Sequence, residues 1–163
     1  MISAKTLAGI ELFEGLPEDD LKKIASLSHE VSFPAQTSIF SPEKTAAHIL
    51  LVLKGTVGLT VHASPLAEPV TISVLNAHGQ VFGFASVLGQ PHHNSSALAV
   101  TDVRALAIDG DRLMDFLAAK PETGFVVMQR IAAVISRRLS TMRTLLLETI
   151  IDYERPASAT PEN

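Results

Sequence analysis

The sequence predicts an α+β, mainly β fold, with a small antiparallel sandwich or barrel between a short N-terminal helical segment and a long C-terminal helix. Three observations indicate this fold. The hydrophobic period is helical at both ends of the chain and close to two in the middle. The length of 163 residues is that of one ordinary domain. Apolar residues make up 47% of the chain and charged residues 18%, which is typical of a core-rich folded protein.

The first predicted element is a short helix that follows Pro17. Proline is well tolerated at the start of a helix, and the acidic residues 18–20 would face the positive end of the helix dipole. Helical spacing then continues through Leu21, Ile24, Ala25 and Leu27. The apolar residues Leu12, Phe13 and Leu16 just upstream are interpreted as core contacts that hold this helix against the body.

Residues from about 30 to 108 are interpreted as a series of short strands. Residues 57–61 and 70–74 each alternate apolar and polar side chains, which gives each segment one apolar face. Further strands are predicted at 31–33, 38–40, 49–53, 97–100 and 103–108. Turn residues separate these segments, so an antiparallel roll is favoured over isolated hairpins.

The helical period returns over residues 112–118, behind Asp109 or Asp111 as cap, and continues from Glu122 to about Tyr153. An apolar ridge repeats along this last helix at steps of four and three, and its large members are Met128, Ile135, Leu139, Met142 and Leu146. One small domain rarely covers so much apolar helix, so the ridge predicts a homodimer. Packing of the helix onto its own sheet is the alternative. We therefore expect a domain over 1–153, with the roll at about 30–108, the C-terminal helices at about 111–153 and a disordered tail over 154–163.

Composition excludes several classes of function. A net charge of −4 would repel a polyphosphate, so no nucleic-acid partner is expected. The chain has no cysteine, which removes disulfides and thiolate metal sites. No apolar run reaches the length of a membrane span, and the N-terminus does not resemble a secretory signal, so a cytoplasmic protein without membrane contact is expected. The six histidines lack metal-site spacing, and no catalytic motif occurs, so neither a metal nor an enzyme is predicted.

Three segments in a fixed order carry a resemblance to a known family. They are residues 12–16 (LFEGL), 51–57 (LVLKGTV) and 78–83 (HGQVFG). With the order of elements, they make the chain, from about residue 7 to 147, resemble the cyclic nucleotide-binding domain family, the sensory part of catabolite-activator-type regulators and kinase regulatory subunits. The resemblance implies that the strands form a double-stranded β-helix, or jelly roll.

In that family the segment after the last Phe-Gly holds the ligand. A short helix offers backbone N–H groups to the cyclic phosphate, a glutamate after the glycine holds the ribose hydroxyl, and an arginine about ten residues on pairs with the phosphate. In this chain Phe84 stands at the glutamate position, and His93, or else His92, stands at the arginine position. No Lys or Arg occurs from 55 to 103, and no Asp or Glu from 70 to 101. Because charge-assisted bonds are worth roughly 1.5–3 kcal/mol each, tight binding of cyclic AMP by the usual contacts is not expected.

The backbone N–H donors of this segment remain, so the sequence predicts a weak or differently selective site for a cyclic nucleotide or another anion. No further cofactor is predicted. The candidate ligand-binding residues are Phe82, Gly83, Phe84, Ala85, Ser86, His92, His93, Asn94, Ser95 and Arg143. The histidines would supply positive charge below about pH 6.5. A solvated loop is the alternative for them, and Phe84 is interpreted as a plug in the sugar's place or as core.

The long helix carries Arg137, Arg138 and Arg143 near the position that would face the pocket. Any of them could replace the cation that is missing from the segment after Phe82 and Gly83. Equally, the Arg137–Arg138 pair is typical of a solvated helix face. Two function hypotheses therefore stand: a small-molecule sensor that signals through this helix, and a roll without ligand that serves as a dimerisation or protein-interaction scaffold.

The chain ends about ten residues after the long helix, so we expect no helix-turn-helix DNA reader unless the sequence is a fragment. Output would then come from self-association or a separate partner protein. Two turns also lack the family's usual glycine, one at Gln36 and one within residues 41–44. Because other residues adopt positive φ at a cost, both turns are predicted to have changed conformation.

Overall fold

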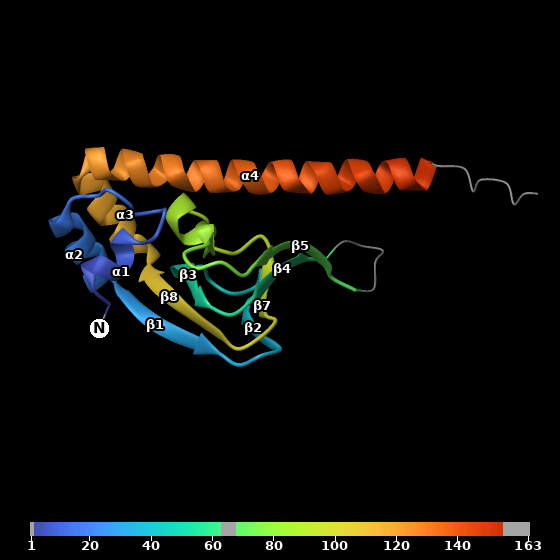
Figure 1. Cartoon of the computed structure of the whole chain (residues 1–163), viewed down its shortest axis with the longest axis horizontal. Coiled ribbons are helices and arrows are strands. Elements are labelled where there is room, and N and C mark those ends of the chain that lie inside the picture. The colour runs from blue at the N-terminus through green and yellow to red at the C-terminus, as the bar shows by residue number, and fades with distance from the viewer. Residues whose placement is uncertain (1, 63–67, 155–163) are drawn as a thin grey trace, which may run out of the picture.

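Two four-stranded antiparallel sheets form a jelly roll in the computed structural model, which describes residues 2–62 and 68–154 (Figure 1). The strand order is β1-β8-β3-β6 in one sheet and β2-β7-β4-β5 in the other. The strands are β1 (Ser28–Phe33), β2 (Thr37–Phe40), β3 (His48–Lys54), β4 (Val57–Val61), β5 (Val70–Leu75), β6 (Val81–Phe82), β7 (Ser96–Ala99) and β8 (Val103–Asp109). The helices are α1 (Ala4–Ala8), α2 (Glu18–Ser26), the 3₁₀ helix η1 (Phe84–Leu88), α3 (Gly110–Ala119) and α4 (Pro121–Glu154).

This architecture confirms the predicted fold class and most of the predicted elements. The exceptions are α1 and β6, which the sequence analysis did not place, whereas η1 lies where the resemblance implies a short helix after Phe82 and Gly83. The five residues of α1 form less than two helical turns and β6 has two residues, so neither shows a hydrophobic period. The predicted tail over 154–163 lies, apart from Glu154, outside the described residues.

Strands β3 and β8 are buried on both faces, which explains their nearly continuous apolar sequences. Ile49 and Leu51 of β3 pack with the helices in one core cluster. Leu50 and Val52 of the same strand point the other way, into a second cluster between the two sheets. The first cluster therefore fastens the helices to the roll, and the second closes the roll itself.

A buried polar contact fastens α4 to α2. The Thr123 hydroxyl donates a hydrogen bond to the Asp20 carboxylate, and both residues are buried. The Lys120 ammonium lies 3.5 Å from the other oxygen of Asp20. At the other end of α3 the Asp109 side chain accepts from the backbone N–H of Arg112, so Asp109 rather than Asp111 is the cap.

The turn at Gln36 keeps the positive φ that glycine would favour, so the prediction that this turn had changed conformation is wrong. Gln36 has a φ of 61°. Its backbone N–H donates to the Ala99 carbonyl at 2.7 Å, and its side-chain amide donates to the Val100 carbonyl at 2.9 Å. These two hydrogen bonds compensate for the backbone strain.

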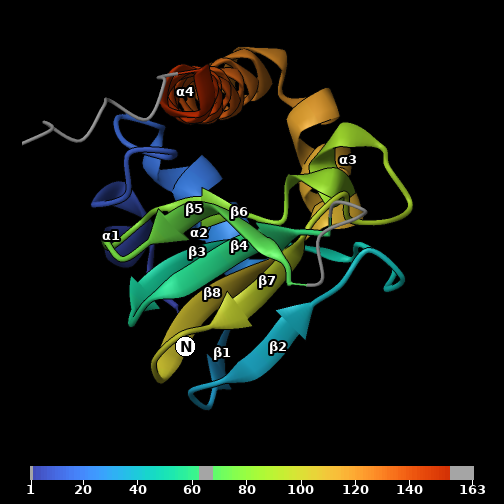
Figure 2. The same cartoon turned by 90° about the vertical axis from the view of Figure 1, so that its right-hand side faces the viewer.

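Helix α4 lies along one side of the molecule and extends well past the roll (Figure 1). Viewed nearly end-on, it runs above β5 and β6 (Figure 2). Its N-terminal part packs into the core through the buried residues Val127 and Ile131. The same stripe continues at helical spacing to Val134 and Arg138, which line a cavity beneath the helix.

Candidate functional site

The cassette, residues 82–95, keeps a backbone with glycine at both ends of its short helix. Gly83 and Gly89 flank η1 with φ values of 73° and 68°, in the left-handed region. A Cβ atom on Gly83 would also lie 3.1 Å from the His48 carbonyl oxygen. Both the conformation and the space at Gly83 therefore favour glycine.

An aromatic stack lies beneath this backbone and includes the candidate ligand residue His93. The His93 ring stacks on Phe40 with 3.7 Å between the ring centroids, and Phe40 stacks in turn on Phe82 at 6.0 Å. His93 is 9% exposed, and burial lowers its pKa below the ordinary histidine value. This placement favours a neutral packing role for His93 over that of a phosphate-binding cation.

Phe84 faces α4 and meets Arg138. The guanidinium carbon of Arg138 lies 5.0 Å from the Phe84 ring centroid, and an N–H of Arg138 donates to the Val81 carbonyl. Burial, together with the nearby Arg137, lowers the pKa of Arg138 to about 10. Within the described part of the chain no carboxylate forms an ion pair with Arg138.

Arg138 is thus the helix cation that reaches the cassette. The interpretation of the Arg137–Arg138 pair as a solvated face holds for Arg137, whose side chain is 59% exposed, but not for Arg138. Helical spacing accounts for this difference once the buried side of α4 is known. Arg138 follows Ile131 by seven residues and Val134 by four, which places it on the stripe that faces the roll.

The remaining cassette candidates divide into buried and exposed groups. Ala85 and Ser86 are buried, and the Ser86 hydroxyl donates to the Gly83 carbonyl at 3.4 Å. A Cβ on Gly110 would lie 2.4 Å from the Ser86 Cβ, so this serine packs tightly against the start of α3. In contrast, His92 and Asn94 are exposed and Ser95 is half-buried.

Two cavities lie between the roll and α4. The first, which we call the arginine groove, has a volume of about 730 Å³ and lies between β5, the turn over 76–80, residues 11–12 and the 130–145 part of α4. The second, the apolar cavity, has about 700 Å³ and lies between residues 70–72 of β5 and the 136–146 part of α4. Arg143 lines the apolar cavity. The cassette candidates line neither cavity, except that Val81 at their edge borders the arginine groove.

The apolar ridge predicted for the dimer interface divides at the middle of α4. Met128 and Ile135 are partly buried against the core of the same chain. Beyond them Leu139 is 66% exposed, Leu146 is 60% exposed and Met142 is 39% exposed. The first part of the ridge therefore packs onto its own roll, as the alternative interpretation proposed, and the second part has no such cover.

The described residues offer neither a metal-binding cluster nor a membrane-spanning helix. Over residues 2–62 and 68–154 no cluster of three or more His, Asp or Glu side chains has the geometry to hold a metal ion. No helix in that part of the chain combines the length and the apolar character needed to cross a membrane.

Comparison with known proteins gives consistent results. The family model of the cyclic nucleotide-binding domain matches residues 30–120. The CRP-like cAMP-activated global transcriptional regulator of Mycobacterium tuberculosis is 24% identical over 144 residues, which are 88% of this chain and 62% of that protein. The chain thus spans less than two thirds of the length of this curated relative.

Solved structures agree with the family match. A protein from Geobacter metallireducens, described as a candidate cyclic nucleotide-binding protein, is 34% identical, with a TM-score of 0.70 over 85% of this chain and 99% of that one. A cyclic nucleotide-binding domain from Methylobacillus flagellatus has the same fold at 19% identity, with a TM-score of 0.74 over 90% of this chain and 81% of that one. By its sequence and its roll, this chain belongs to the cyclic nucleotide-binding domain family.

Proposed function

We propose that this chain is a regulatory sensor domain whose cassette binds a cyclic nucleotide or another small anion weakly or with altered selectivity, and that α4 transmits the occupancy of that site. The observation that carries the proposal is the contact between Phe84 and Arg138. It joins the first residue of η1 directly to α4, so a ligand that displaces the Phe84 ring must also change a contact of the helix.

Weak binding follows from the chemistry of the cassette. The N–H groups at the start of η1 can donate to an anion, and Gly83 keeps the left-handed φ with which this segment begins. However, a phenylalanine ring offers no acceptor to a sugar hydroxyl, and the His93 ring stacks on Phe40, where burial lowers its pKa and disfavours the positive charge. The strong charged contacts are therefore missing, while the weaker backbone contacts remain.

The experiment compares cyclic AMP and cyclic GMP by isothermal titration calorimetry in the unaltered chain, in Phe84→Glu and in Leu88→Glu. Phe84→Glu introduces a carboxylate beside the Arg138 guanidinium, which would orient it toward a ribose hydroxyl. We expect no submicromolar binding in the unaltered chain and at least about tenfold tighter binding in Phe84→Glu. Leu88→Glu adds the same charge at an exposed position of η1 and should leave binding unchanged.

Submicromolar binding by the unaltered chain would reject the weak cassette. Absence of millimolar binding in both the unaltered chain and Phe84→Glu would reject the sensor and favour the scaffold.

One observation supports the dimer contact of the scaffold hypothesis, since Leu139 and Leu146 are exposed on α4 beyond its packing on the roll. We propose that these residues meet the same ridge of a second copy in a two-fold homodimer.

A further inference from the structure

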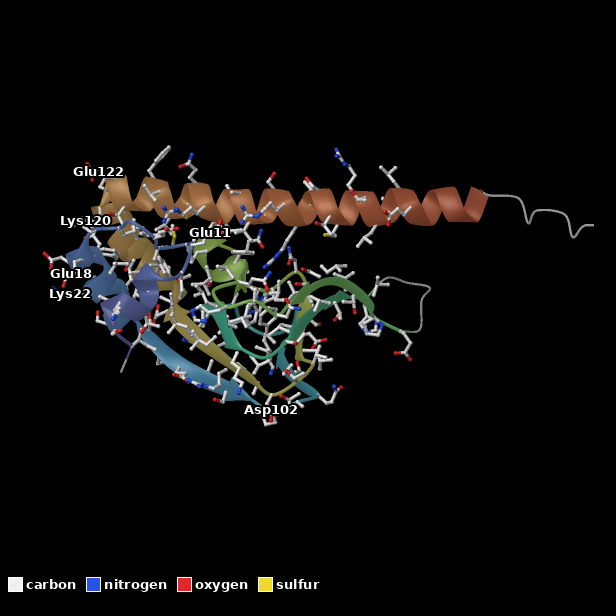
Figure 3. All side chains as sticks on the ribbon, viewed as in Figure 1. Glu11, Glu18, Lys22, Asp102, Lys120 and Glu122 are labelled. Atoms are coloured by element: carbon white, nitrogen blue, oxygen red, sulfur yellow. The ribbon has the colours of Figure 1, made fainter. Side chains whose placement is uncertain are left out.

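The arginine groove carries an unbalanced positive charge. Arg130, Arg137 and Arg138 all line it from α4, whereas Glu11 is the one acidic residue among its described lining residues. Glu11 lies just beneath α4 (Figure 3), and its carboxylate is 3.3 Å from a guanidinium nitrogen of Arg137. Both side chains of that pair are more than half exposed, so water screens much of their attraction.

The other two arginines donate to backbone carbonyls. A guanidinium N–H of Arg130 donates to the Leu12 carbonyl at 3.2 Å, and one of Arg138 donates to the Val81 carbonyl. Neither forms an ion pair with a described carboxylate. A guanidinium held by one carbonyl still has several donors to offer, because it carries five N–H groups. Burial and the neighbouring Arg137 lower the pKa of Arg138.

The opposite wall of the groove mixes apolar and hydrogen-bonding groups. Leu12, Ile72 and Val134 supply apolar surface, while Thr71 and Ser73 come from β5. Strand β5 is at the edge of its sheet and pairs with β4 alone among the described strands, so its outer backbone groups have no partner strand. A volume of about 730 Å³ lies in the range of small-molecule sites.

We propose that the arginine groove is a second ligand site, separate from the cassette, for a small organic anion that joins a phosphate or carboxylate group to an apolar body. The anionic group meets the guanidinium groups of Arg137 and Arg138, which can bind either anion with paired hydrogen bonds. The apolar body lies against Leu12 and Ile72. Because Arg138 also covers Phe84, an anion in the groove competes with Phe84 for this guanidinium.

The test uses the full chain and two chemically matched probe pairs at constant ionic strength. Phenyl phosphate is compared with inorganic phosphate, and 3-phenylpropionate with acetate, by NMR titration of backbone amides. We expect one or both phenyl compounds to shift the amides of Gly79, Gln80 and Val81, and to bind at least tenfold more tightly than the matched small anion. The stronger phenyl compound identifies whether phosphate or carboxylate is preferred.

Three substitutions assign the site. Arg137→Gln and Arg138→Gln should each weaken binding of the preferred phenyl compound at least tenfold. Arg112→Gln removes the same charge from an exposed position of α3 that lines neither cavity, so binding should be unchanged. Arg137 is exposed, so its variant is expected to fold normally and serves as the decisive test if Arg138→Gln loses its structure.

Several results would overturn the proposal. They are no amide shift at 79–81 with either phenyl compound at 10 mM, equal affinity in Arg137→Gln and the unaltered chain, or shifts confined to residues 83–87. The last result would place the anion in the cassette and leave the proposed sensor function standing. Failure of the cassette titrations, in turn, would leave the groove proposal untouched.

Discussion

Arg138 stacks its guanidinium over the ring of Phe84, 5.0 Å from the centroid, and so joins the long helix to the first residue of η1. A glutamate at this position, which the resemblance to the family implies, would place a carboxylate beside the same arginine. In this chain the Phe84 ring stands there instead. The Arg138 guanidinium lies over this ring and donates a hydrogen bond to the Val81 carbonyl. The ring makes a contact with α4 but offers no acceptor to a sugar hydroxyl.

A double-mutant cycle measures this contact. Phe84→Leu and Arg138→Met are combined, and the free energy of unfolding in urea is compared with the single variants. Because the pair is half-buried, we expect a coupling energy of about 0.5–1 kcal/mol. The cycle of Phe84→Leu with Arg143→Met is the control and should give none. Equal coupling energies in the two cycles would contradict a specific cation–π contact.

Stability should depend on pH through His93. Burial lowers the folded-state pKa of His93 below its ordinary value of 6.5, so the unfolded chain takes up the proton first as the pH falls. The contribution of the neutral ring is present in full above the unfolded-state value and declines as the pH falls toward the lower folded-state value. His93→Phe, which keeps a ring on Phe40, should reduce the loss of unfolding free energy between pH 7.5 and 5.5. His92→Phe, at an exposed position, should not reduce this loss. Equal pH profiles for all three proteins would reject the role of His93 in the pH dependence.

The buried contact between Thr123 and Asp20 should be important for stability. Thr123→Val removes the hydroxyl that donates to a buried carboxylate while keeping the shape of the side chain. We expect unfolding free energy to fall by about 1–3 kcal/mol, as measured by urea denaturation. Thr144→Val is the matched control, because its exposed hydroxyl donates only to the Ser140 carbonyl of the same helix. Similar losses in the two variants would mean that the buried bond contributes nothing specific.

The turn at Gln36 allows a test of backbone strain. At a φ of 61°, glycine should be favoured over alanine by about 1 kcal/mol. Gln36→Gly and Gln36→Ala both lose the side-chain bond to the Val100 carbonyl, so their difference isolates the backbone. Thermal unfolding should therefore show the glycine variant melting above the alanine variant. The reverse order would show that the turn does not hold positive φ in solution.

The homodimer is tested by light scattering coupled to size exclusion at tens of micromolar. We expect the unaltered chain to have twice the mass of the monomer and Leu139→Glu to be monomeric or aggregated, because the variant places like charges across the contact. Val100→Glu changes an apolar side chain that is also exposed but lies in the turn between β7 and β8 rather than on α4, and it should leave the dimer intact. A monomeric unaltered chain would refute the dimer.

The sequence by itself determined the kinds of element and their order. Alternation over 57–61 and 70–74 identified β4 and β5, and helical spacing after residue 121 identified α4, because these periods are local properties of the chain. It also determined that residues 70–101 contain no carboxylate for a sugar. Very short elements such as β6 could not be predicted, since two residues are too few to show a period.

Only the tertiary structure decided which side of α4 faces the roll. Two neighbouring stripes on this helix could face the roll. One is the apolar ridge, and the other runs through Val127, Ile131 and Arg138, one residue away from the ridge along the sequence. Periodicity cannot choose between neighbouring stripes, because the surface that receives the helix comes from distant parts of the chain. The same reason explains His93, whose sequence neighbours are polar but whose ring is buried by Phe40, more than fifty residues away along the chain.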